Sequence, residues 1–239
     1  MMKFLYIFPH PDDESFGPAP GISKQVRMGH QVYLLTLTRG EATRVRFKLG
    51  VTKAEMGEIR YREMQEMAKV LNLTELIVLD LPDSGLKELD PRIIENVISN
   101  TIERIRPQII ITYPVHGISG FHDHLVTHAV VKRVFAELSS LDNTYLRRLA
   151  FFTLSEPTEK VDGIHQLNYS THEEIDCIMQ VDDVDVKNFH RALDCYKTYQ
   201  EVIEASGVRK MITQEVHYEI YRENHHPPLK DLTQGIDEG

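Results

Sequence analysis

The feature that most restricts the fold is an alternation of short apolar runs with longer helix-like segments over about the first 150 residues. The apolar runs are bounded by glycine, proline or polar residues, which is typical of buried strands. The segments between them carry apolar residues at helical spacing, and one begins with Asp90-Pro91, a cap residue followed by proline at the first helical position. Five strands are therefore expected, at residues 3–8, 31–37, 76–79, 109–112 and 148–154.

This alternation predicts an α/β fold, a Rossmann-like three-layer sandwich with a mostly parallel sheet and helices on both faces. Ligands of such folds bind beyond the carboxyl ends of the strands, where the strand order reverses. In the common order, the first and fourth strands are neighbours at that point. The active site is therefore expected where the segments after residues 8 and 112 meet.

The length of 239 residues indicates one domain, residues 1–239, with a polar C-terminal tail from about residue 227. After residue 154 the pattern is less regular. A strand is expected within 174–181, a helix over 184–199 and a last strand over 217–222.

Charge and composition exclude several classes of protein. The net charge of -9 argues against nucleic-acid binding, which depends on basic surfaces. No apolar run approaches the roughly 20 residues that span a bilayer, and the N-terminus lacks the pattern of a signal peptide. The two cysteines, Cys177 and Cys195, have no metal-ligand spacing and fit a reducing compartment. We therefore expect a cytoplasmic protein without a membrane span or a nucleic-acid partner.

The segment 8–14, Phe-Pro-His-Pro-Asp-Asp-Glu, directly follows the first predicted strand. Prolines on both sides of His10 prevent a continued β-ladder or a helix start. The result is a rigid turn that presents an imidazole and three carboxylates, ligand types that bind zinc or a similar ion. A solvated acidic helix start is the alternative. A second cluster at 121–124, Phe-His-Asp-His, follows the fourth strand and favours the metal site.

These motifs resemble the LmbE-like (PIG-L) deacetylase family, zinc-dependent hydrolases that act mainly on N-acetylglucosamine conjugates. The first family motif, a small residue followed by His-Pro-Asp-Asp-Glu, matches residues 9–14 apart from its first position. The second, His-Pro-Asp-His, is similar to residues 121–124. Weaker similarities lie at 38–41, 60–63 and 81–83, so the resemblance covers roughly the first 135 residues.

The resemblance implies that His10, Asp13 and His124 bind one Zn²⁺ per chain, or another divalent ion, and that Asp12 is the general base. Three protein ligands leave a position for a water, which zinc makes acidic enough to ionise near neutral pH. A carboxylate beside that water can take its proton and later protonate the departing amine. Asp123 is expected to orient one of the imidazole ligands.

One position departs from the family pattern. Phe121 stands where the family has a histidine that is thought to aid the oxyanion or the leaving group. We expect His122 to take over this catalytic role, with His116 as the alternative. A further alternative is that the mechanism depends more on Asp12, or that activity is weak or directed to another substrate.

Three more residues are expected, by the same analogy, to bind sugar hydroxyls of the substrate. They are Glu41, Arg60 and Asp83, and each could instead form a structural ion pair or cap a turn. Tyr196 and Tyr199, at a predicted helix end, could reach the pocket, although core packing or a subunit contact is the default expectation.

The resemblance thus implies an enzyme, a zinc-dependent amide hydrolase (N-deacetylase) that removes an N-acetyl or related acyl group from an amino-sugar conjugate. Its partner is that small-molecule substrate, and because relatives commonly assemble, a homo-oligomer is expected. Two alternatives remain open: an amidase on another small N-acyl or thiol-conjugate metabolite, and a non-catalytic sugar- or nucleotide-binding module. A nucleotide is disfavoured because no glycine-rich phosphate loop follows the first strand. A phosphatase or nuclease commonly holds two metals, and ligands for only one are found.

Overall fold

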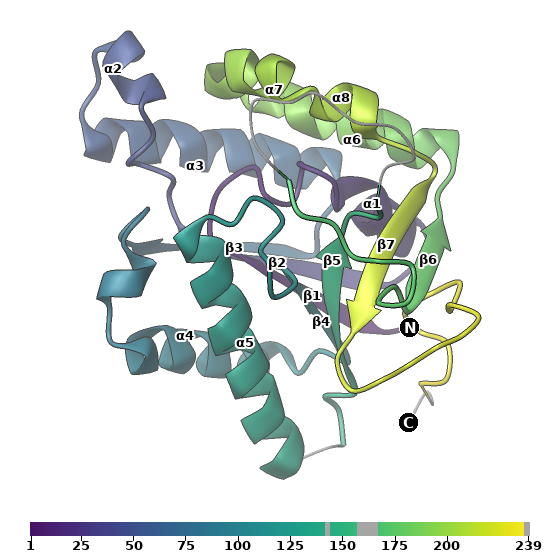
Figure 1. Ribbon diagram of the computed structural model, residues 1–239. Helices are drawn as coiled ribbons and strands as arrows, with labels where there is room; N and C mark the ends of the chain where they lie inside the picture. The colour runs from purple at the N-terminus through teal and green to yellow at the C-terminus, as the bar shows by residue number, and fades with distance from the viewer. Residues whose placement is uncertain (142–143, 157–166, 237–239) are drawn as a thin grey trace.

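The computed structural model describes residues 1–141, 144–156 and 167–236. Its centre is a seven-stranded sheet of order β3-β2-β1-β4-β5-β7-β6 (Figure 1). Strands β1 to β5 all run parallel to one another, and β7 is antiparallel to both β5 and β6. The α/β class and all five predicted strands are confirmed. The strands are β1 (Lys3–Phe8), β2 (Gln31–Thr38), β3 (Glu75–Leu81), β4 (Ile109–Thr112), β5 (Arg148–Thr153), β6 (Cys177–Gln180) and β7 (Glu215–Ile220).

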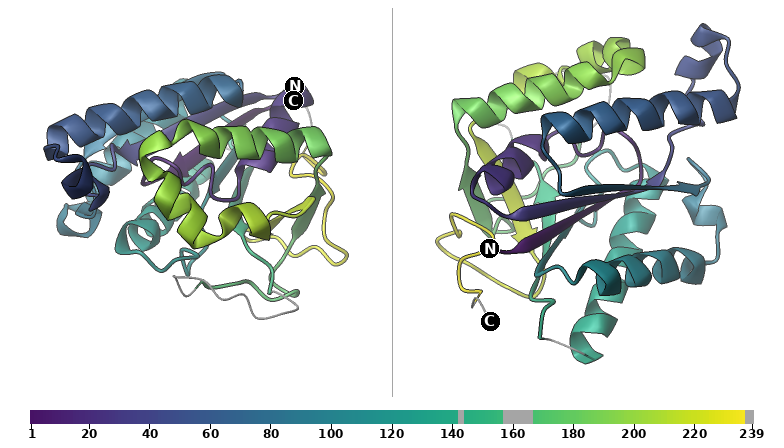
Figure 2. Two further views of the ribbon diagram at one scale, coloured as in Figure 1. Left: turned by 90° about the horizontal axis from the view of Figure 1, so that it is seen from above. Right: turned by 180° about the vertical axis from the view of Figure 1, so that it is seen from behind.

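Helices cover both faces of the sheet and form the two outer layers (Figure 2). One face carries α1 (Ala19–Arg27), α3 (Lys53–Val70) and α6 (Asp183–Cys195), and the other carries α4 (Pro91–Ile105) and α5 (His122–Leu141). None of the helices within the described ranges is both long and apolar enough to cross a membrane. Shorter elements are α2 (Val45–Leu49), α7 (Gln200–Ser206), α8 (Val208–Met211) and the 3-10 turns Leu86–Glu88 and Lys197–Tyr199.

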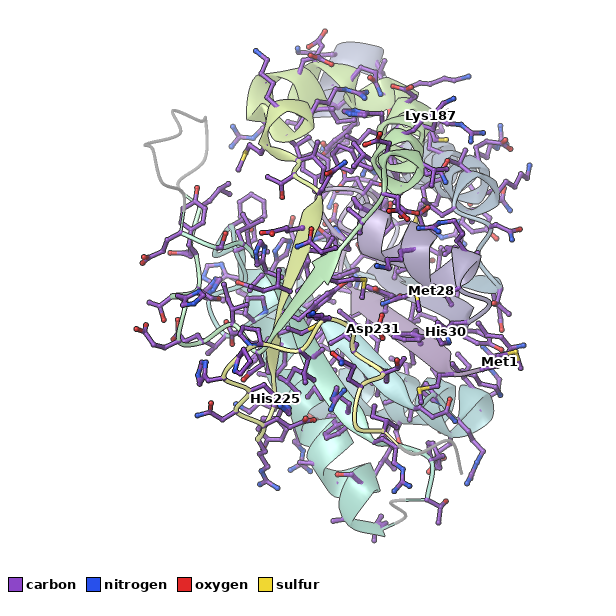
Figure 3. All side chains as sticks on the ribbon, turned by 90° about the vertical axis from the view of Figure 1, so that its right-hand side faces the viewer. Met1, Met28, His30, Lys187, His225 and Asp231 are labelled. Carbon is purple, nitrogen blue, oxygen red and sulfur yellow. The ribbon has the colours of Figure 1, made fainter. Side chains whose placement is uncertain are left out.

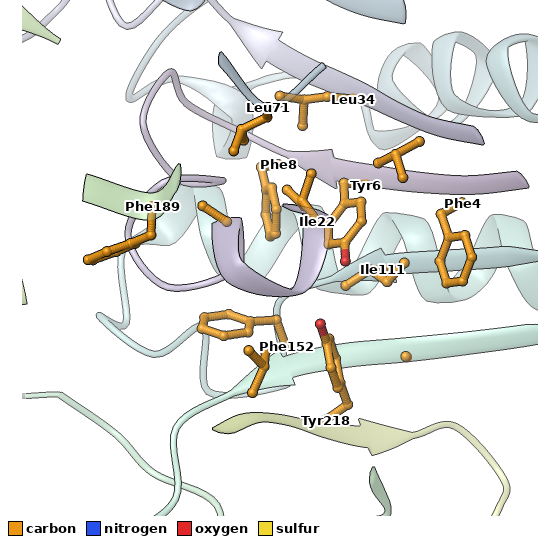
Figure 4. Close-up of a cluster of buried hydrophobic side chains, with 14 of the residues drawn as sticks. Phe4, Tyr6, Phe8, Ile22, Leu34, Leu71, Ile111, Phe152, Phe189 and Tyr218 are labelled. Atoms are coloured by element: carbon orange, nitrogen blue, oxygen red, sulfur yellow. The ribbon is translucent and has the colours of Figure 1, made fainter. Parts of the chain in front are cut away.

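The alternation of side chains along β1 connects the sheet to both outer layers. Successive residues of a strand point to opposite faces. Phe4, Tyr6 and Phe8 therefore pack in one core with side chains from α1, α3 and α6 (Figure 4). Leu5 and Ile7 pack in the second core, with α4 and α5. All five side chains are fully buried, which explains why β1 is a continuous apolar run.

Two helices of the sandwich begin at the polar residues that the physical chemistry of helix ends favours. Asp90 accepts a hydrogen bond from the Arg92 amide, and Pro91 occupies the first helical position of α4, as predicted. In α3, the side chains of Thr52 and Glu55 form a reciprocal capping box. These caps fix where each helix leaves the loop before it.

The structure differs from the sequence-based expectation in the short helices. In the basic segment after β2, Val45–Leu49 forms a short helix that the sequence pattern did not indicate. The helix expected over 184–199 ends at Cys195 and continues as a 3-10 turn followed by α7 and α8. These elements are shorter than the window over which periodicity can be recognised.

The predicted tail from residue 227 is wrong for residues 227–236, which pack on the fold. The Leu229 amide donates to the carbonyl of Asp176 over 2.8 Å, and the Ile178 amide donates to the carbonyl of Leu229 over 2.9 Å. Leu232 is fully buried. These leucines give an otherwise polar segment enough apolar contact to stay beside β6; Figure 3 shows the segment with Asp231 labelled.

Candidate metal centre and active site

The two sequence motifs meet where the strand order reverses. Strands β1 and β4 are direct neighbours, with Phe4 opposite Ile109 and Tyr6 opposite Ile111. The loop after β1 carries the first motif, and the loop after β4 leads into α5, whose first turn carries the second. The predicted convergence of two segments more than a hundred residues apart is confirmed.

Asp13 lies between two imidazoles. Its Oδ2 is 3.5 Å from Nδ1 of His10, and its Oδ1 is 3.4 Å from Nε2 of His124. One ligand atom from each of the three residues lies within 4.8 Å of the others. Asp13 and His124 are buried and His10 is partly buried, so the structure brings together the three residues predicted to bind metal.

The hydrogen bonds of His124 leave one ring nitrogen ready to bind a cation. Its Nδ1 lies 2.9 Å from the carbonyl oxygen of Gly117, and because a carbonyl only accepts, Nδ1 carries the proton. In the neutral imidazole, Nε2 then holds the lone pair that a metal ion would use. It is buried and has no hydrogen-bond partner among the described residues. A buried acceptor without a partner costs free energy, and a cation between His124 and Asp13 removes that cost.

Asp123 holds His10 from the opposite side. Nε2 of His10 donates to Oδ2 of Asp123 over 3.2 Å, and Oδ1 of Asp83 lies 3.4 Å from the same nitrogen. The backbone amides of Ser84 and Leu86 also donate to Asp123, over 2.8 Å and 3.2 Å. These three hydrogen bonds fix the buried carboxylate of Asp123. Because Asp123 binds Nε2 of His10, Nδ1 of His10 faces Asp13, as expected if Asp123 orients His10 as a metal ligand.

The electrostatics of the cluster favour a bound cation. Burial alone would lower the pKa of His10, but its hydrogen bonds to Asp123 and Asp13 raise that pKa to about 10. Burial alone would raise the pKa of Asp13, yet His124 and His10 hold it far below its usual range. Two imidazole nitrogens and a carboxylate oxygen are the donor set of open zinc-type sites. The residues present therefore fit a single divalent ion.

Tyr113 is a member of the site that sequence reasoning missed. Its hydroxyl donates to Oδ1 of Asp13 over 2.9 Å. Its ring stacks on the imidazole of His124, with 4.2 Å between ring centroids and 8° between planes. Its position directly after β4 was the available signal, since strand ends supply site residues in this fold.

Asp12 lies next to Asp13 in an unusual backbone conformation, with φ of +83°. One amino group of Arg60 donates to Oδ2 of Asp12 and to the carbonyl of Pro11, each over 2.7 Å. Burial raises the pKa of Asp12 to about 6, although Arg60 opposes the rise. Arg60 itself is only 1% exposed. The prediction that Arg60 binds sugar hydroxyls is therefore replaced by a contact with Asp12.

Glu41 and Asp83, also predicted to bind substrate, join two loops at the same end of the sheet. Oε1 of Glu41 accepts from the Asp83 amide over 3.0 Å, and Oδ2 of Asp83 accepts from the Ala42 amide over 2.7 Å. This reciprocal pairing is the structural role left open as an alternative. Oδ1 of Asp83 still faces His10, so Asp83 borders the metal cluster and Glu41 contacts it only through Asp83.

His122 and His116, the two candidates to replace the missing family histidine, differ in their exposure and contacts. His122 is the first residue of α5 and its side chain is exposed. The ring of Phe121 lies edge-on to His124, 5.6 Å between centroids. His116 accepts from the Ile118 amide over 3.1 Å, and burial lowers its pKa. His116 also contacts the hydroxyl of Ser170 over 3.3 Å, whereas the side chain of His122 is exposed.

Comparisons with known proteins find related sequences and structures. The profile of the PIG-L family, described as GlcNAc-PI de-N-acetylase, matches residues 5–135. A 1D-myo-inositol 2-acetamido-2-deoxy-alpha-D-glucopyranoside deacetylase of Thermomonospora curvata is 28% identical over 55% of this chain and 51% of its own. The N-acetylglucosaminyl-phosphatidylinositol de-N-acetylase of Bos taurus is 28% identical over 56% and 51%. The chain spans about half the length of these curated relatives.

Solved structures share the fold at low sequence identity. The 4-carboxy-2-hydroxymuconate hydratase of Pseudomonas putida superposes with a TM-score of 0.68 and 14% identity, over 94% of this chain and 98% of the other. That protein is named for a hydration, not for an amide hydrolysis. The structural likeness therefore supports the architecture, and the reaction must be argued from the site.

Proposed function

Because the chain belongs to the PIG-L (GlcNAc-PI de-N-acetylase) family, we propose that it is a zinc-dependent amide hydrolase that removes an N-acyl group, by preference N-acetyl, from an amino-sugar conjugate. The observation that carries the proposal is the buried Nε2 of His124, which faces Asp13 and lacks a hydrogen-bond partner among the described residues. The names of both relatives, which act on N-acetylglucosamine conjugates, support the substrate class.

His10, Asp13 and His124 would hold the ion. A divalent ion bound there supplies Lewis acidity for the attacking water and for the amide carbonyl. The surrounding residues fix the ligands before any ion binds: Asp123 sets the His10 ring, and Tyr113 donates to one oxygen of Asp13. Zn²⁺ suits this donor set best, and another divalent ion is the alternative.

We assign Asp12 as the general base. Its carboxylate takes a proton from water as the water oxygen bonds to the acyl carbon. As the C–N bond breaks, the same carboxyl group returns the proton to the leaving nitrogen, so one water is consumed and an amine and a carboxylic acid are released, and the acid then ionises. Arg60 fixes Oδ2 of Asp12 by a direct hydrogen bond, which leaves the other oxygen available for the proton.

For the missing family histidine, we assign His122 to the oxyanion or the leaving amine, since its side chain is exposed and it begins the helix that carries His124. Glu41 and Asp83 are proposed to contact sugar hydroxyls at the rim, where Oε2 of Glu41 has no partner within the described part of the chain. If His122→Ala hydrolyses substrate as fast as the wild type while His116→Ala is slower, the role belongs to His116.

The proposal is tested by metal content and by acetate release from N-acetylglucosamine glycosides. We expect one divalent ion per chain in the wild type and its loss, with activity, in both Asp13→Ala and His124→Ala. His217→Ala, a partly buried histidine on β7, is the matched control and should keep ion and activity. A wild-type protein that takes up no added Zn²⁺, or variants that release acetate normally, would contradict the proposal.

A further inference from the structure

Arg60 is a buried cation that is only partly satisfied by hydrogen bonds. One of its two amino groups, Nη2, donates to Asp12 and to the carbonyl of Pro11. Nε and the second amino group are buried without a hydrogen-bond partner among the described residues. Asp12 is its carboxylate partner, at 2.7 Å. A guanidinium removed from water in this way needs a further compensating contact.

Two tyrosines from the C-terminal part of the chain supply that contact. The guanidinium carbon of Arg60 lies 3.8 Å from the ring centroid of Tyr199 and 5.8 Å from that of Tyr196. A cation over an aromatic face is attracted by the negative face of the ring, most strongly where water is excluded. Both tyrosines lie outside residues 5–135, the range that matches the family.

The segment that carries these tyrosines is fixed against the N-terminal half of the site. It follows α6, which packs alongside α3 (Figures 1 and 2). Each of its hydroxyl-bearing residues has a partner on an element close to the first motif. The hydroxyl of Tyr196 donates to Glu14 over 2.7 Å, the Thr198 amide and hydroxyl donate to Glu63 over 2.7 Å and 2.9 Å, and the hydroxyl of Tyr199 donates to Thr43 over 2.8 Å.

The backbone conformation of Asp12 explains why Arg60 must be held in place. A φ of +83° is unfavourable for a residue with a side chain and persists only when its surroundings determine it. Arg60 bonds on both sides of this point, to the carbonyl of Pro11 and to the side chain of Asp12. Fixing Arg60 therefore also fixes the direction in which the Asp12 carboxylate points.

We propose that Tyr199 is a positioning residue for the hydrolysis, because its ring holds the Arg60 guanidinium that fixes the general base Asp12. The inference rests on the proposed function. Removing the ring opens the buried donors of Arg60 to water, so the Asp12 carboxylate loses its single orientation. His10, Asp13 and His124 are held by other partners and should retain the ion.

The experiment compares Tyr199→Ala with Tyr199→Phe, which keeps the ring and loses the bond to Thr43. We expect Tyr199→Ala to lower kcat for acetate release about 10- to 100-fold, as misplaced catalytic groups do, with KM changed less than about threefold and one ion still bound. Tyr199→Phe should stay within about threefold of the wild type, because it restores the cation–ring contact.

Tyr221→Ala is the matched control, since Tyr221 is also half-buried and its ring lies 5.2 Å from Lys132 and 5.0 Å from Arg222, away from the metal cluster. Its kcat should be unchanged. If Tyr199→Ala loses its folded circular-dichroism spectrum, Tyr199→Leu, which keeps apolar bulk without a π face, is measured in its place.

The coupling to Arg60 is tested with Arg60→Lys. If Tyr199 acts through Arg60, adding Tyr199→Ala to Arg60→Lys should slow hydrolysis much less than it slows the wild type. Fully additive losses, or a normal kcat in Tyr199→Ala, would overturn the inference. A wild-type protein that releases no acetate from any substrate would instead contradict the proposed function, and the inference with it.

Discussion

Replacing Asp123 by Asn tests whether this buried carboxylate prepares His10 for metal binding. Oδ2 of Asp123 accepts from the Ser84 amide and from His10, and Oδ1 accepts from the Leu86 amide. An Asn side chain has one oxygen, so its amino group must face at least one of these donors. We expect a loss of about 1–3 kcal/mol of folding stability and a Zn²⁺ affinity about 10- to 100-fold weaker.

The affinity is measured by competition with a chromogenic chelator, and the stability by urea unfolding without metal. Asp176→Asn is the control: Asp176 is also buried and accepts from two amides, of Ile220 and His225, away from the metal cluster. It should lose similar stability and bind Zn²⁺ normally. The reasoning would be refuted if Asp123→Asn bound Zn²⁺ within about twofold of the wild type, since that is less than 0.5 kcal/mol.

Two further predictions concern Gly40 and Glu223. A Cβ on Gly40, whose φ is +63°, would lie 2.8 Å from Nε of Arg60, so Gly40→Ala should slow acetate release. Gly50 is the control, since its φ is +67° and its Cβ would have no atom within 4 Å. Gly50→Ala should lower the stability measured by urea unfolding by only about 1–2 kcal/mol. Burial alone would raise the pKa of Glu223, but Arg148 holds it below its ordinary value, so their ion pair stabilises the fold above that ordinary pKa and is lost in acid. Glu223→Gln should therefore lower stability by about 1–2 kcal/mol at pH 7, and the difference in Tm from the wild type should shrink as the pH falls below 4; an equal difference at both pH values would contradict this.

The location of the metal cluster could be predicted because it depends on two regularities that a sequence displays. Ligand types such as those of His10 and Asp13 are visible in the chain, and strand alternation places the ends of β1 and β4 together. The role of Asp123 followed from its position beside His124. Tyr113 was missed because nothing in a single tyrosine shows that its hydroxyl will point at Asp13.

For Arg60, the sequence indicated that the side chain is buried but did not identify its partner. It shares the buried face of α3 with Met56, Met64 and Met67, at helical spacing. An arginine on an apolar stripe must be buried with a partner for its charge. The helix pattern therefore predicts a buried ion pair and argues against a sugar contact. It does not identify Asp12 as the partner, because that depends on how the loop after β1 packs against α3.

The same face of α3 also explains how the C-terminal part of the chain becomes part of the site. It buries a second charged residue, Glu63, which accepts two hydrogen bonds from Thr198. Glu63 thus fixes the 3-10 turn in which Tyr199 reaches Arg60. One helix thereby holds Asp12 through Arg60 and the 3-10 turn through Glu63. Tyr199 lies outside residues 5–135, the range that matches the family, so this contact joins the C-terminal part of the chain to the part that carries the family motifs.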